Sequence, residues 1–536
     1  MSDADQFDFI IAGAGSAGCV LANRLSEDGR YRVALVEGGS RDNWIWFHIP
    51  VGYLFAIGNP RSDWMFRTEA IPGLKGRSLA YPRGKVLGGC SAINAMIYMR
   101  GQAADYDGWR QRGLEGWGWD DVLPIFRKHE DNWRGSSPLH GRGGEWRVEQ
   151  PRLRWKILDA FRDAAAEAGI QRSVDFNTGT NEGCGYFDVN QKRGRRWSAA
   201  RGFLRPALSR PNLEVITGAL ADRVIVKDGR AVGLAIRHEG RSRILHAKGE
   251  VVISTGAVAT PALLERSGIG DGSRLGTLGI DVVHHSPGVG ENLQDHLQIR
   301  PIYSVQNVPT LNMQYRSLVR RGLMGLEYAL LRRGAMTMAP SQLGAFTRSS
   351  PEYETPNVQM HIQPLSLDKF GDSMHDFPAI TTSICNLRPT SRGSIHARSP
   401  RVEDAPIIEP NYLSTVEDQQ VAADSIRVVR NIMAQPAMSA YAPSEVRPGA
   451  GLTTDGELVD AAAELGTTIF HPVGTARMGI DSDSHAVVDA SLRVRGVDRL
   501  RVIDASVMPT ITSGNTNSPT VMIAEKGAAM ILDGAR

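Results

Sequence analysis

Three glycines near the start of the chain have the spacing of a dinucleotide-binding turn. They form Gly13-x-Gly15-x-x-Gly18, and Glu37 follows 19 positions after Gly18 (37 minus 18). In such a turn the first glycine permits a tight bend, the second lets the backbone approach a pyrophosphate, and the third lets a helix pack on a strand. A carboxylate at the position of Glu37 accepts a hydrogen bond from a ribose hydroxyl. The motif alone does not separate FAD from NAD as the ligand.

The segments around these glycines are typical of one βαβ unit. Phe7 to Ile11 is an apolar run suited to a buried strand, a helical pattern follows Gly18, and residues 33–37 form a second apolar run. The N-terminus of the intervening helix would face the phosphates with unpaired N–H groups and a favourable dipole. We therefore add to the predicted nucleotide site the residues Ser16, Ala17 and Gly38.

Composition excludes several classes of protein. The 536 residues are 42% apolar and 22% charged, with a net charge of +3, which favours a soluble protein with more than one core and argues against a nucleic-acid partner. The four cysteines show no metal spacing, so we expect reduced thiols and no metal site. We find no signal peptide and no run of about 18 apolar residues, so we expect a cytoplasmic protein without a transmembrane segment. The motifs of serine hydrolases and of P-loop ATPases do not occur.

Five further segments resemble, in order, motifs of the glucose–methanol–choline (GMC) flavin oxidoreductases. They are PRGKVLGGCSAIN (residues 82–94), GAVATP (256–261, continuing to 270), GVGENLQDH (288–296), HPVGT (471–475) and SGNTN (513–517). The resemblance runs from residue 7 to near the end of the chain and is strongest to choline-dehydrogenase-like and other alcohol dehydrogenases. It implies that the dinucleotide is FAD.

The resemblance also implies the fold, which is α/β with an α+β second domain. We expect a Rossmann-type FAD-binding domain with an inserted substrate-binding domain. The first is formed by residues 1–150, 197–304 and 465–536, and the second by residues 305–464 with part of 151–196. Strand patterns at 251–254, 358–362 and 500–504 and helical patterns at 317–331 and 419–432 fit this division.

The family pattern implies further contacts with the cofactor. Gly88 and Gly89 would let the main chain approach the flavin ring, and Asp504-Ala505 would meet the ribityl and pyrophosphate groups. Some relatives carry a histidine at the position of Ile93 and bond it to the flavin; isoleucine has no nucleophile, so we expect non-covalent FAD. The full set of implied contacts is Arg83, Val86, Gly88, Gly89, Ser91, Asn94, Ala95, Met96, Val224, Thr255, Gly256, Asp504, Ala505, Asn515 and Thr516.

The same resemblance assigns a catalytic pair, His471 and Asn515. In the family the matching histidine faces the flavin and takes the proton of the substrate hydroxyl, and the second position holds His or Asn. An alcohol is a poor hydride donor until its O–H is deprotonated, and a histidine with a pKa near 6.5 suits that task. The Asn515 amide would stabilise the developing alkoxide. We expect oxidation of a primary alcohol, with hydride transfer to flavin N5.

Several points stay open at this stage. The electron acceptor is expected to be a quinone or another non-oxygen acceptor; the alternatives are an alcohol oxidase that uses O2, a non-redox lyase, and a non-catalytic flavin-binding protein. Choline would need an aromatic cage with a carboxylate, which the sequence does not show. An aromatic stretch could cover a pocket or belong to the core, namely Trp44, Trp46, Phe47 and Phe55. A homodimer is only a working hypothesis.

The helical pattern at residues 317–331 is basic and partly amphipathic. Its apolar side chains are flanked by Arg316, Arg320, Arg321, Arg332 and Arg333. Such a helix could rest on anionic lipid and bring the enzyme to a membrane quinone. The sequence alone favours the simpler interpretation, a solvated helix that covers part of the core.

Overall fold

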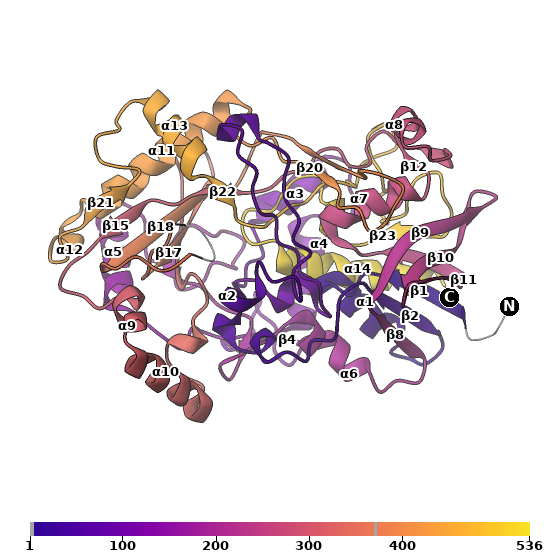
Figure 1. Cartoon of the computed structure of the whole chain (residues 1–536), viewed down its shortest axis with the longest axis horizontal. Helices are drawn as coiled ribbons and strands as arrows, with labels where there is room; N and C mark the ends of the chain where they lie inside the picture. Colours follow the sequence, from indigo (N-terminus) through magenta and orange to yellow (C-terminus); the bar gives the residue numbers. More distant parts are fainter. Residues whose placement is uncertain (1–4, 369–371, 536) are drawn as a thin grey trace.

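Two β-sheets organise the chain, and they lie side by side along its long axis (Figure 1). The computed structural model describes residues 5–368 and 372–535. The first sheet has seven strands in the order β8-β2-β1-β11-β10-β9, with β23 paired to β11. Its strands are β1 (Gln6–Ala12), β2 (Val33–Glu37), β8 (Leu213–Thr217), β9 (Ala219–Lys227), β10 (Arg230–His238), β11 (Arg241–Ile253) and β23 (Leu500–Val502).

The centre of the first sheet is parallel. β1 pairs in parallel with β2 and β11, and the C-terminal half of β11 also pairs in parallel with β23, whereas its N-terminal half pairs antiparallel with β10. The helix α1 (Ser16–Leu25) connects β1 to β2, which confirms the predicted βαβ unit. These strands are buried on both faces, because helices cover them, and this explains their continuous apolar runs. The expected mixed α/β fold is confirmed.

The second sheet is antiparallel and contains eight strands. Its main order is β21-β15-β18-β17-β16-β5, and β14 pairs with both β18 and β22. The strands are β5 (Gly183–Tyr186), β14 (Leu297–Ile299), β15 (Ile302–Ser304), β16 (Leu343–Thr347), β17 (Val358–Gln363), β18 (Ala379–Asn386), β21 (Ser444–Arg447) and β22 (Thr467–Thr468). Strands from before residue 305 and after residue 464 thus join this sheet.

Strand β17 shows how the second sheet separates its two faces. Its apolar residues Val358, Met360 and Ile362 join the core formed with the helices that cover one face. The intervening polar residues are also buried, and two of them, His361 and Gln363, line the large cavity on the other face. The alternation in the sequence therefore separates core from cavity rather than core from solvent.

Helices cover both sheets. Up to residue 277 they are α2 (Tyr53–Ala56), α3 (Ala103–Gln111), α4 (Trp119–His129), α5 (Lys156–Glu167), α6 (Arg205–Ala207), α7 (Gly256–Arg266) and α8 (Gly272–Thr277). Beyond it they are α9 (Leu311–Arg316), α10 (Leu318–Leu331), α11 (Val416–Met433), α12 (Pro436–Ser439), α13 (Asp455–Leu465) and α14 (Asn517–Gly534).

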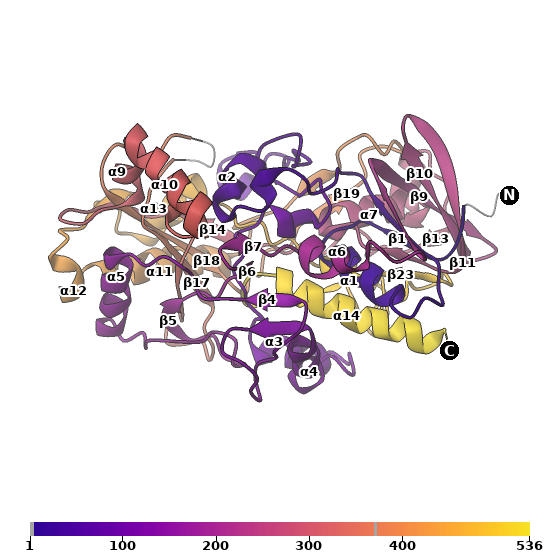
Figure 2. The same ribbon diagram turned by 90° about the horizontal axis from the view of Figure 1, so that it is seen from below.

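Helices distant in sequence pack together around each core. α14 crosses beneath the first sheet against α1, as Figure 2 shows, and α5, α11 and α13 surround the second core. The helices expected at 317–331 and 419–432 correspond to α10 and α11. Within the described ranges, none of the helices is long and apolar enough to cross a membrane.

Short segments complete the fold. Between residues 42 and 87 the helical elements are α2 and the 3₁₀ helices η2 (Ile45–Phe47), η3 (Pro50–Gly52) and η4 (Pro72–Leu74), with isolated β-bridges such as Asp63 to Gly84. Four small two-stranded pairs lie elsewhere: β3 (Glu130–Asn132) with β4 (Trp146–Val148), β6 (Gln191–Lys192) with β7 (Arg195–Arg196), β12 (Ile269–Gly270) with β13 (His284–His285), and β19 (Ser394–His396) with β20 (Ile407–Glu409).

Candidate active site

A cavity of about 780 Å³ extends between the two sheets. It begins at the carboxyl ends of parallel strands, where ligands bind in open α/β sheets. Its opposite wall comes from the second sheet and includes Gln298, His361 and Gln363. The residues expected at the cofactor or the reaction that line it are Gly13, Gly15, Ser16, Ala17, Glu37, Gly38, Arg83, Gly89, Asn94, Ala95, Met96, Thr255, Gly256, His471, Asp504, Ala505, Asn515 and Thr516.

Three helices begin at this cavity: α1 at Ser16, α7 at Gly256 and α14 at Asn517. The N-cap residues of these helices make no side-chain cap hydrogen bond, and the first turns contain no acidic residue. At α7, however, the Asp504 carboxylate accepts from the Gly256 N–H. The Ser16 hydroxyl donates to Asn517 Oδ1 at 2.6 Å, which ties the first and third helix starts together. Helix N-termini favour anions, so this end of the cavity suits a pyrophosphate.

The glycines of the turn have separate roles. Gly13 has φ +99°, and a Cβ there would lie 2.4 Å from the carbonyl oxygen of Ser254. A Cβ on Gly18 would lie 1.8 Å from the Gly13 carbonyl oxygen, so only glycine lets α1 pack on β1. A Cβ on Gly15 would meet no protein atom within 4 Å and would project into free space. That space is the cradle a phosphate group requires.

Buried carboxylates organise the loops around this end. Glu37 accepts backbone N–H bonds from Ala14 at 2.9 Å and from Gly39 at 2.7 Å. Burial raises its pKa to about 7, although these hydrogen bonds oppose the shift. Asp504 accepts from the backbone N–H of Gly256 at 2.8 Å, and burial raises its pKa as well.

Five of the expected contact residues lie outside the cavity wall. Gly18, Val86 and Gly88 are part of the packing around the glycine turns. The Ser91 hydroxyl donates to the Gly88 carbonyl oxygen at 2.6 Å. Val224 is buried in β9, where its N–H donates to the Ser267 hydroxyl oxygen. The cavity is lined instead by residues 218–221, at the start of that strand.

His471 and Asn515 meet at the wall of the cavity. The Asn515 side-chain nitrogen lies 3.1 Å from His471 Nε2, and Asn515 Oδ1 accepts from Gln359 Nε2 at 3.4 Å. The amide orientation is thereby set, with its N–H groups toward the histidine. Both residues are buried. The structure thus brings together the two side chains that the family resemblance assigned as the catalytic pair.

A second histidine determines the tautomer of His471. His296 Nε2 lies 3.2 Å from the carbonyl oxygen of Leu387, which can only accept, so this nitrogen carries the proton. His296 Nδ1 is then an acceptor in the neutral ring, and it lies 3.1 Å from His471 Nδ1. His471 must therefore donate from Nδ1, which leaves Nε2 unprotonated, as the acceptor of the Asn515 side-chain N–H.

Burial keeps these rings neutral. The pKa of His471 lies well below its usual value, first because of burial and then because His296, His361 and Arg83 disfavour a positive charge. Burial lowers the pKa of His296 to about 4 and that of His361 to about 3. The lone pair on His471 Nε2 is therefore available at neutral pH.

Asp295 fixes the backbone of the catalytic histidine. This buried carboxylate accepts from the His471 N–H at 2.8 Å and from the Thr468 hydroxyl at 2.6 Å. It also accepts hydrogen bonds from two buried phenols, Tyr81 and Tyr412. The segment before His471 is bent, with Phe470 at φ +71°, and these bonds hold that bend in place.

Sequence reasoning missed part of the site. It quoted His296 and Asp295 in a family motif and Gln359 and His361 in a strand, yet gave none of them a role. For Gln359 and His361 the sequence did contain a signal, because polar residues alternate with apolar ones along that strand. Of the aromatic stretch, Phe47 is buried in a small cluster and Phe55 stacks on Trp46. None of the four aromatic residues of this stretch lines the cavity. Tyr53 and Ile57 line it instead.

Comparisons with known proteins identify the family of the chain. Family models described as GMC oxidoreductase match residues 7–298 and 389–524. The chain is 43% identical over 530 residues to an alcohol dehydrogenase [acceptor] of Pseudomonas putida, covering 98% of this chain and 96% of that one. It is 40% identical to an oxygen-dependent choline dehydrogenase of Vibrio vulnificus, covering 98% and 94%.

Solved structures share the fold. Pyridoxine 4-oxidase from Mesorbium loti superposes with a TM-score of 0.88 at 31% identity, covering 97% of this chain and 98% of that one. A formate oxidase superposes with a TM-score of 0.91 at 25% identity, covering 100% and 99%.

Fold and site together define a flavin-dependent oxidoreductase with a Rossmann-type nucleotide site. The chain belongs to the GMC oxidoreductase family, whose cofactor is FAD. The uncapped start of α1 and the free space at Gly15 fit that cofactor.

Proposed function

We propose that this enzyme oxidises a primary alcohol to the aldehyde, with His471 Nε2 as the base that accepts the hydroxyl proton. The observation that carries the proposal is the hydrogen-bond chain from Leu387 through His296 to His471, which exposes an unprotonated Nε2 toward the cavity. When bound, FAD supplies the hydride acceptor at this site.

His471 accepts the proton and Asn515 stabilises the alkoxide in the proposed reaction. As the hydroxyl proton moves to His471 Nε2, the ring becomes positive and its Nδ1–H bond to His296 strengthens. The low pKa of the buried ring makes His471 a weak base, so the alkoxide must be stabilised as it forms. The Asn515 amide, fixed by Gln359, provides an N–H donor beside His471 Nε2 for that purpose.

The charges of the cavity favour an uncharged alcohol. Its carboxylates are Glu37, Glu403, Asp404 and Asp504. Glu37 ends β2 and Asp504 follows β23, both in the first sheet. Glu403 interacts electrostatically with Arg266 of α7. The wall formed by the second sheet, opposite them, contributes only neutral side chains among the described residues: Gln298, Ser341, His361 and Gln363. A quaternary ammonium such as choline would have no carboxylate partner there.

FAD is proposed to bind without a covalent link. Ile93 lines the cavity and is buried, and an isoleucine cannot bond to the flavin. Acid precipitation should therefore release all yellow colour into the supernatant. A flavin that stays with the precipitated protein would contradict this point.

The electron acceptor is proposed to be a quinone or another non-oxygen acceptor. The relative from Pseudomonas putida, named an alcohol dehydrogenase [acceptor], supports this assignment. The main alternative is an oxidase that makes hydrogen peroxide, which the structural likeness to pyridoxine 4-oxidase and formate oxidase favours.

Anaerobic flavin reduction tests the function. The purified enzyme is mixed with aliphatic and aromatic primary alcohols and with choline, and the visible flavin absorption is followed. Bleaching by primary alcohols, with little by choline, is expected. Adding a quinone or O2 to the bleached enzyme then shows which acceptor restores the colour faster. A yellow enzyme that no alcohol bleaches would favour a lyase or a non-catalytic flavoprotein.

A further inference from the structure

Helix α10 carries a row of apolar side chains that face solvent. Leu318, Val319, Leu323, Leu326, Leu330 and Leu331 are 56–78% exposed. Only Tyr328 of this helix is buried; its hydroxyl donates to the Gly194 carbonyl oxygen at 3.1 Å. The interpretation of this helix as a cover for the core is therefore wrong for its apolar stripe, because the stripe points away from the protein.

The spacing of four of these side chains places them on one face of the helix. Val319, Leu323, Leu326 and Leu330 follow one another at intervals of four, three and four residues, which places them along a single side of an α-helix. Tyr328 falls on the opposite side at 3.6 residues per turn. A solvated helix needs no such apolar side, so the face calls for a partner.

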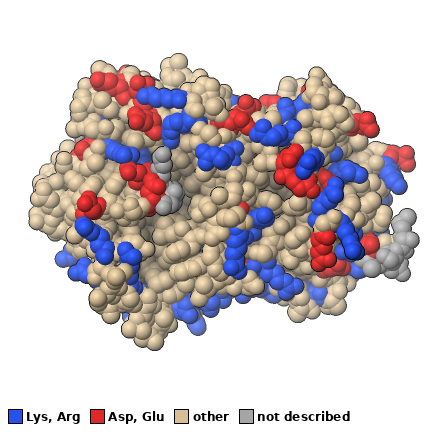
Figure 3. Space-filling view, viewed as in Figure 1, with Lys and Arg blue, Asp and Glu red and all other residues tan. Residues whose placement is uncertain are grey.

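The charges around the row are nearly all positive. Residues 311–334 contain five arginines and one carboxylate, Glu327, a net charge of +4 (five minus one). The adjoining β6–β7 hairpin, which holds Gly194, adds exposed Lys192 and Arg193. In Figure 3 the lobe at the lower left shows an uncharged face with Lys and Arg side chains beside it.

A second apolar group lies on the same side of the molecule. Ile45 of η2 and Leu54 and Phe55 of α2 are 63%, 42% and 42% exposed. Their segment contacts α10 through η3 and η7 (Ala335–Thr337). Figures 1 and 2 both place α2 beside α10, and the exposed apolar side chains of the two groups are together called here the α10–α2 surface.

We propose that the α10–α2 surface docks on an anionic lipid bilayer, with its apolar side chains among the acyl chains and its arginines at the headgroups. Apolar side chains on one helix face with cations at its borders match the boundary between hydrocarbon and anionic headgroups. A second copy of this chain fits less well, because a pairing of two such surfaces would bring two arginine sets together.

Docking would set the cavity beside the membrane. Tyr53 and Ile57, within or next to α2, line the cavity, as do Pro340 and Ser341, a few residues beyond η7. Apolar alcohols and quinones concentrate in bilayers, so a docked enzyme would meet both at this wall. The proposal concerns binding alone and does not require the proposed oxidation.

Vesicle sedimentation with the FAD-loaded full chain tests the proposal. Vesicles of phosphatidylcholine are compared with vesicles in which about a quarter of the lipid is phosphatidylglycerol. Binding to the anionic vesicles is expected, reduced by salt. Leu323→Ser/Leu326→Ser should weaken binding at least about tenfold by removing inserted apolar surface. Arg320→Gln/Arg333→Gln should weaken it on the order of tenfold or more, and only on anionic vesicles.

A matched control separates docking from general hydrophobicity. Val174 and Val416 are 86% and 81% exposed and lie outside the α10–α2 surface; Val174→Ser/Val416→Ser should bind vesicles as the wild type does. FAD content and melting temperature confirm that each variant is folded. Absence of binding to anionic vesicles, or equal binding by wild type and leucine variant, would overturn the proposal. So would a leucine variant that only converts a dimer to a monomer in sedimentation velocity.

Discussion

The side-chain nitrogen of Asn515 lies 3.1 Å from His471 Nε2, although 44 positions separate the two residues in the chain. His471 is held through its backbone by Asp295, whereas Asn515 precedes α14, which packs under the first sheet. Two independent supports thus converge on one point of the cavity wall. A hydroxyl at that point could give its proton to one residue and accept a hydrogen bond from the other.

Substitution of Asn515 should separate its chemical role from its structural one. Asn515→Ala removes the N–H donor and is expected to lower the rate of flavin reduction on the order of a hundredfold. Asn515→His restores a ring N–H and should recover most of that loss. Stopped-flow reduction under anaerobic conditions measures both. Equal rates in the alanine variant and the wild type would remove Asn515 from the proposed chemistry.

His296 acts through His471 and is a positioning residue. His296→Leu leaves the Nδ1–H of His471 without its acceptor, so the ring is free to take the other tautomer, in which Nε2 is protonated. We expect kcat to fall at least about tenfold with little change in KM. His296→Gln, which offers an acceptor oxygen, should recover part of the loss. A change confined to KM would contradict the tautomer argument.

Gly15 and Gly18 provide a matched pair of substitutions. A Cβ at Gly15 enters free space, whereas a Cβ at Gly18 would lie 1.8 Å from the Gly13 carbonyl oxygen. Gly15→Ala should therefore fold with a near-normal melting temperature in the absence of FAD, yet bind FAD much more weakly. Gly18→Ala should lower the melting temperature of the apoprotein itself. Normal FAD affinity in Gly15→Ala would contradict a phosphate at this position.

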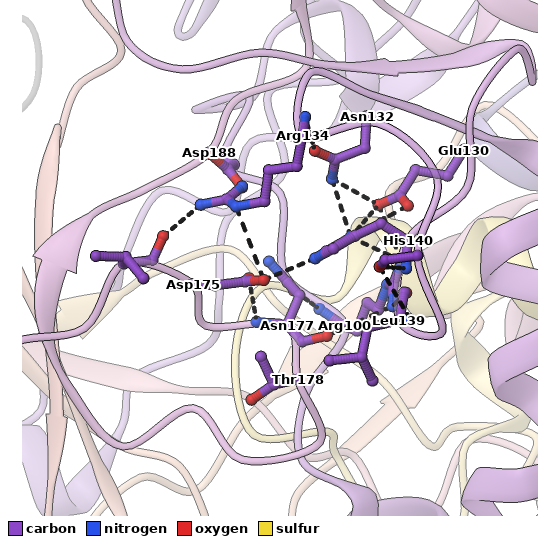
Figure 4. A network of polar contacts seen from close by, with 12 residues as sticks. Arg100, Glu130, Asn132, Arg134, Leu139, His140, Asp175, Asn177, Thr178 and Asp188 are labelled. Atoms are coloured by element: carbon purple, nitrogen blue, oxygen red, sulfur yellow. Dashed lines mark hydrogen bonds and ion pairs between the residues drawn. The ribbon is translucent and has the colours of Figure 1, made fainter.

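A buried ion network predicts how stability depends on pH. In Figure 4, His140 lies between Asp175 and Glu130, and Arg100 and Arg134 complete the network. His140 Nε2 is 2.6 Å from Asp175, and hydrogen bonds to the two carboxylates raise the pKa of His140 to about 9 although burial opposes this shift. The charged ring stabilises the fold fully below its unfolded pKa of 6.5, and the stabilisation is lost as the pH rises through about 9.

The melting temperature of the wild type should therefore fall by a few degrees, as an order-of-magnitude estimate, between these two pH values. In His140→Asn the decline should be shallower. It should not vanish, because His396, between Glu265 and Glu291, also has a pKa raised to about 9. If the melting temperatures of wild type and variant declined in parallel from pH 6 to 10, His140 would contribute nothing to this pH dependence.

Local patterns predicted the centre of the first sheet, β1, β2, the end of β11 and β23, but not β8, β9 or β10. The glycine spacing, two apolar runs and Glu37 are a contiguous signal, because a βαβ unit forms within about thirty residues. Val224 was assigned to the cofactor by the family resemblance, because its local pattern is that of a core strand residue. In the structure its N–H donates to Ser267, and its contact with the cofactor stays a prediction.

The catalytic surroundings were harder to predict because they are assembled from distant segments. His296 and His471 are 175 positions apart, and their contact depends on how β14 and β22 pair in the second sheet. Likewise, α10 is amphipathic in sequence, but only the structure shows that its apolar side faces outward rather than toward the core.

Anaerobic flavin reduction by a primary alcohol, in wild type and in His471→Ala, tests the central claim most directly. Both proteins should contain FAD, and both should be bleached by dithionite, which needs no base. The account predicts that the alcohol bleaches the wild type rapidly and the variant at least about a hundredfold more slowly. Reduction of His471→Ala at the wild-type rate would show that this histidine is not the base.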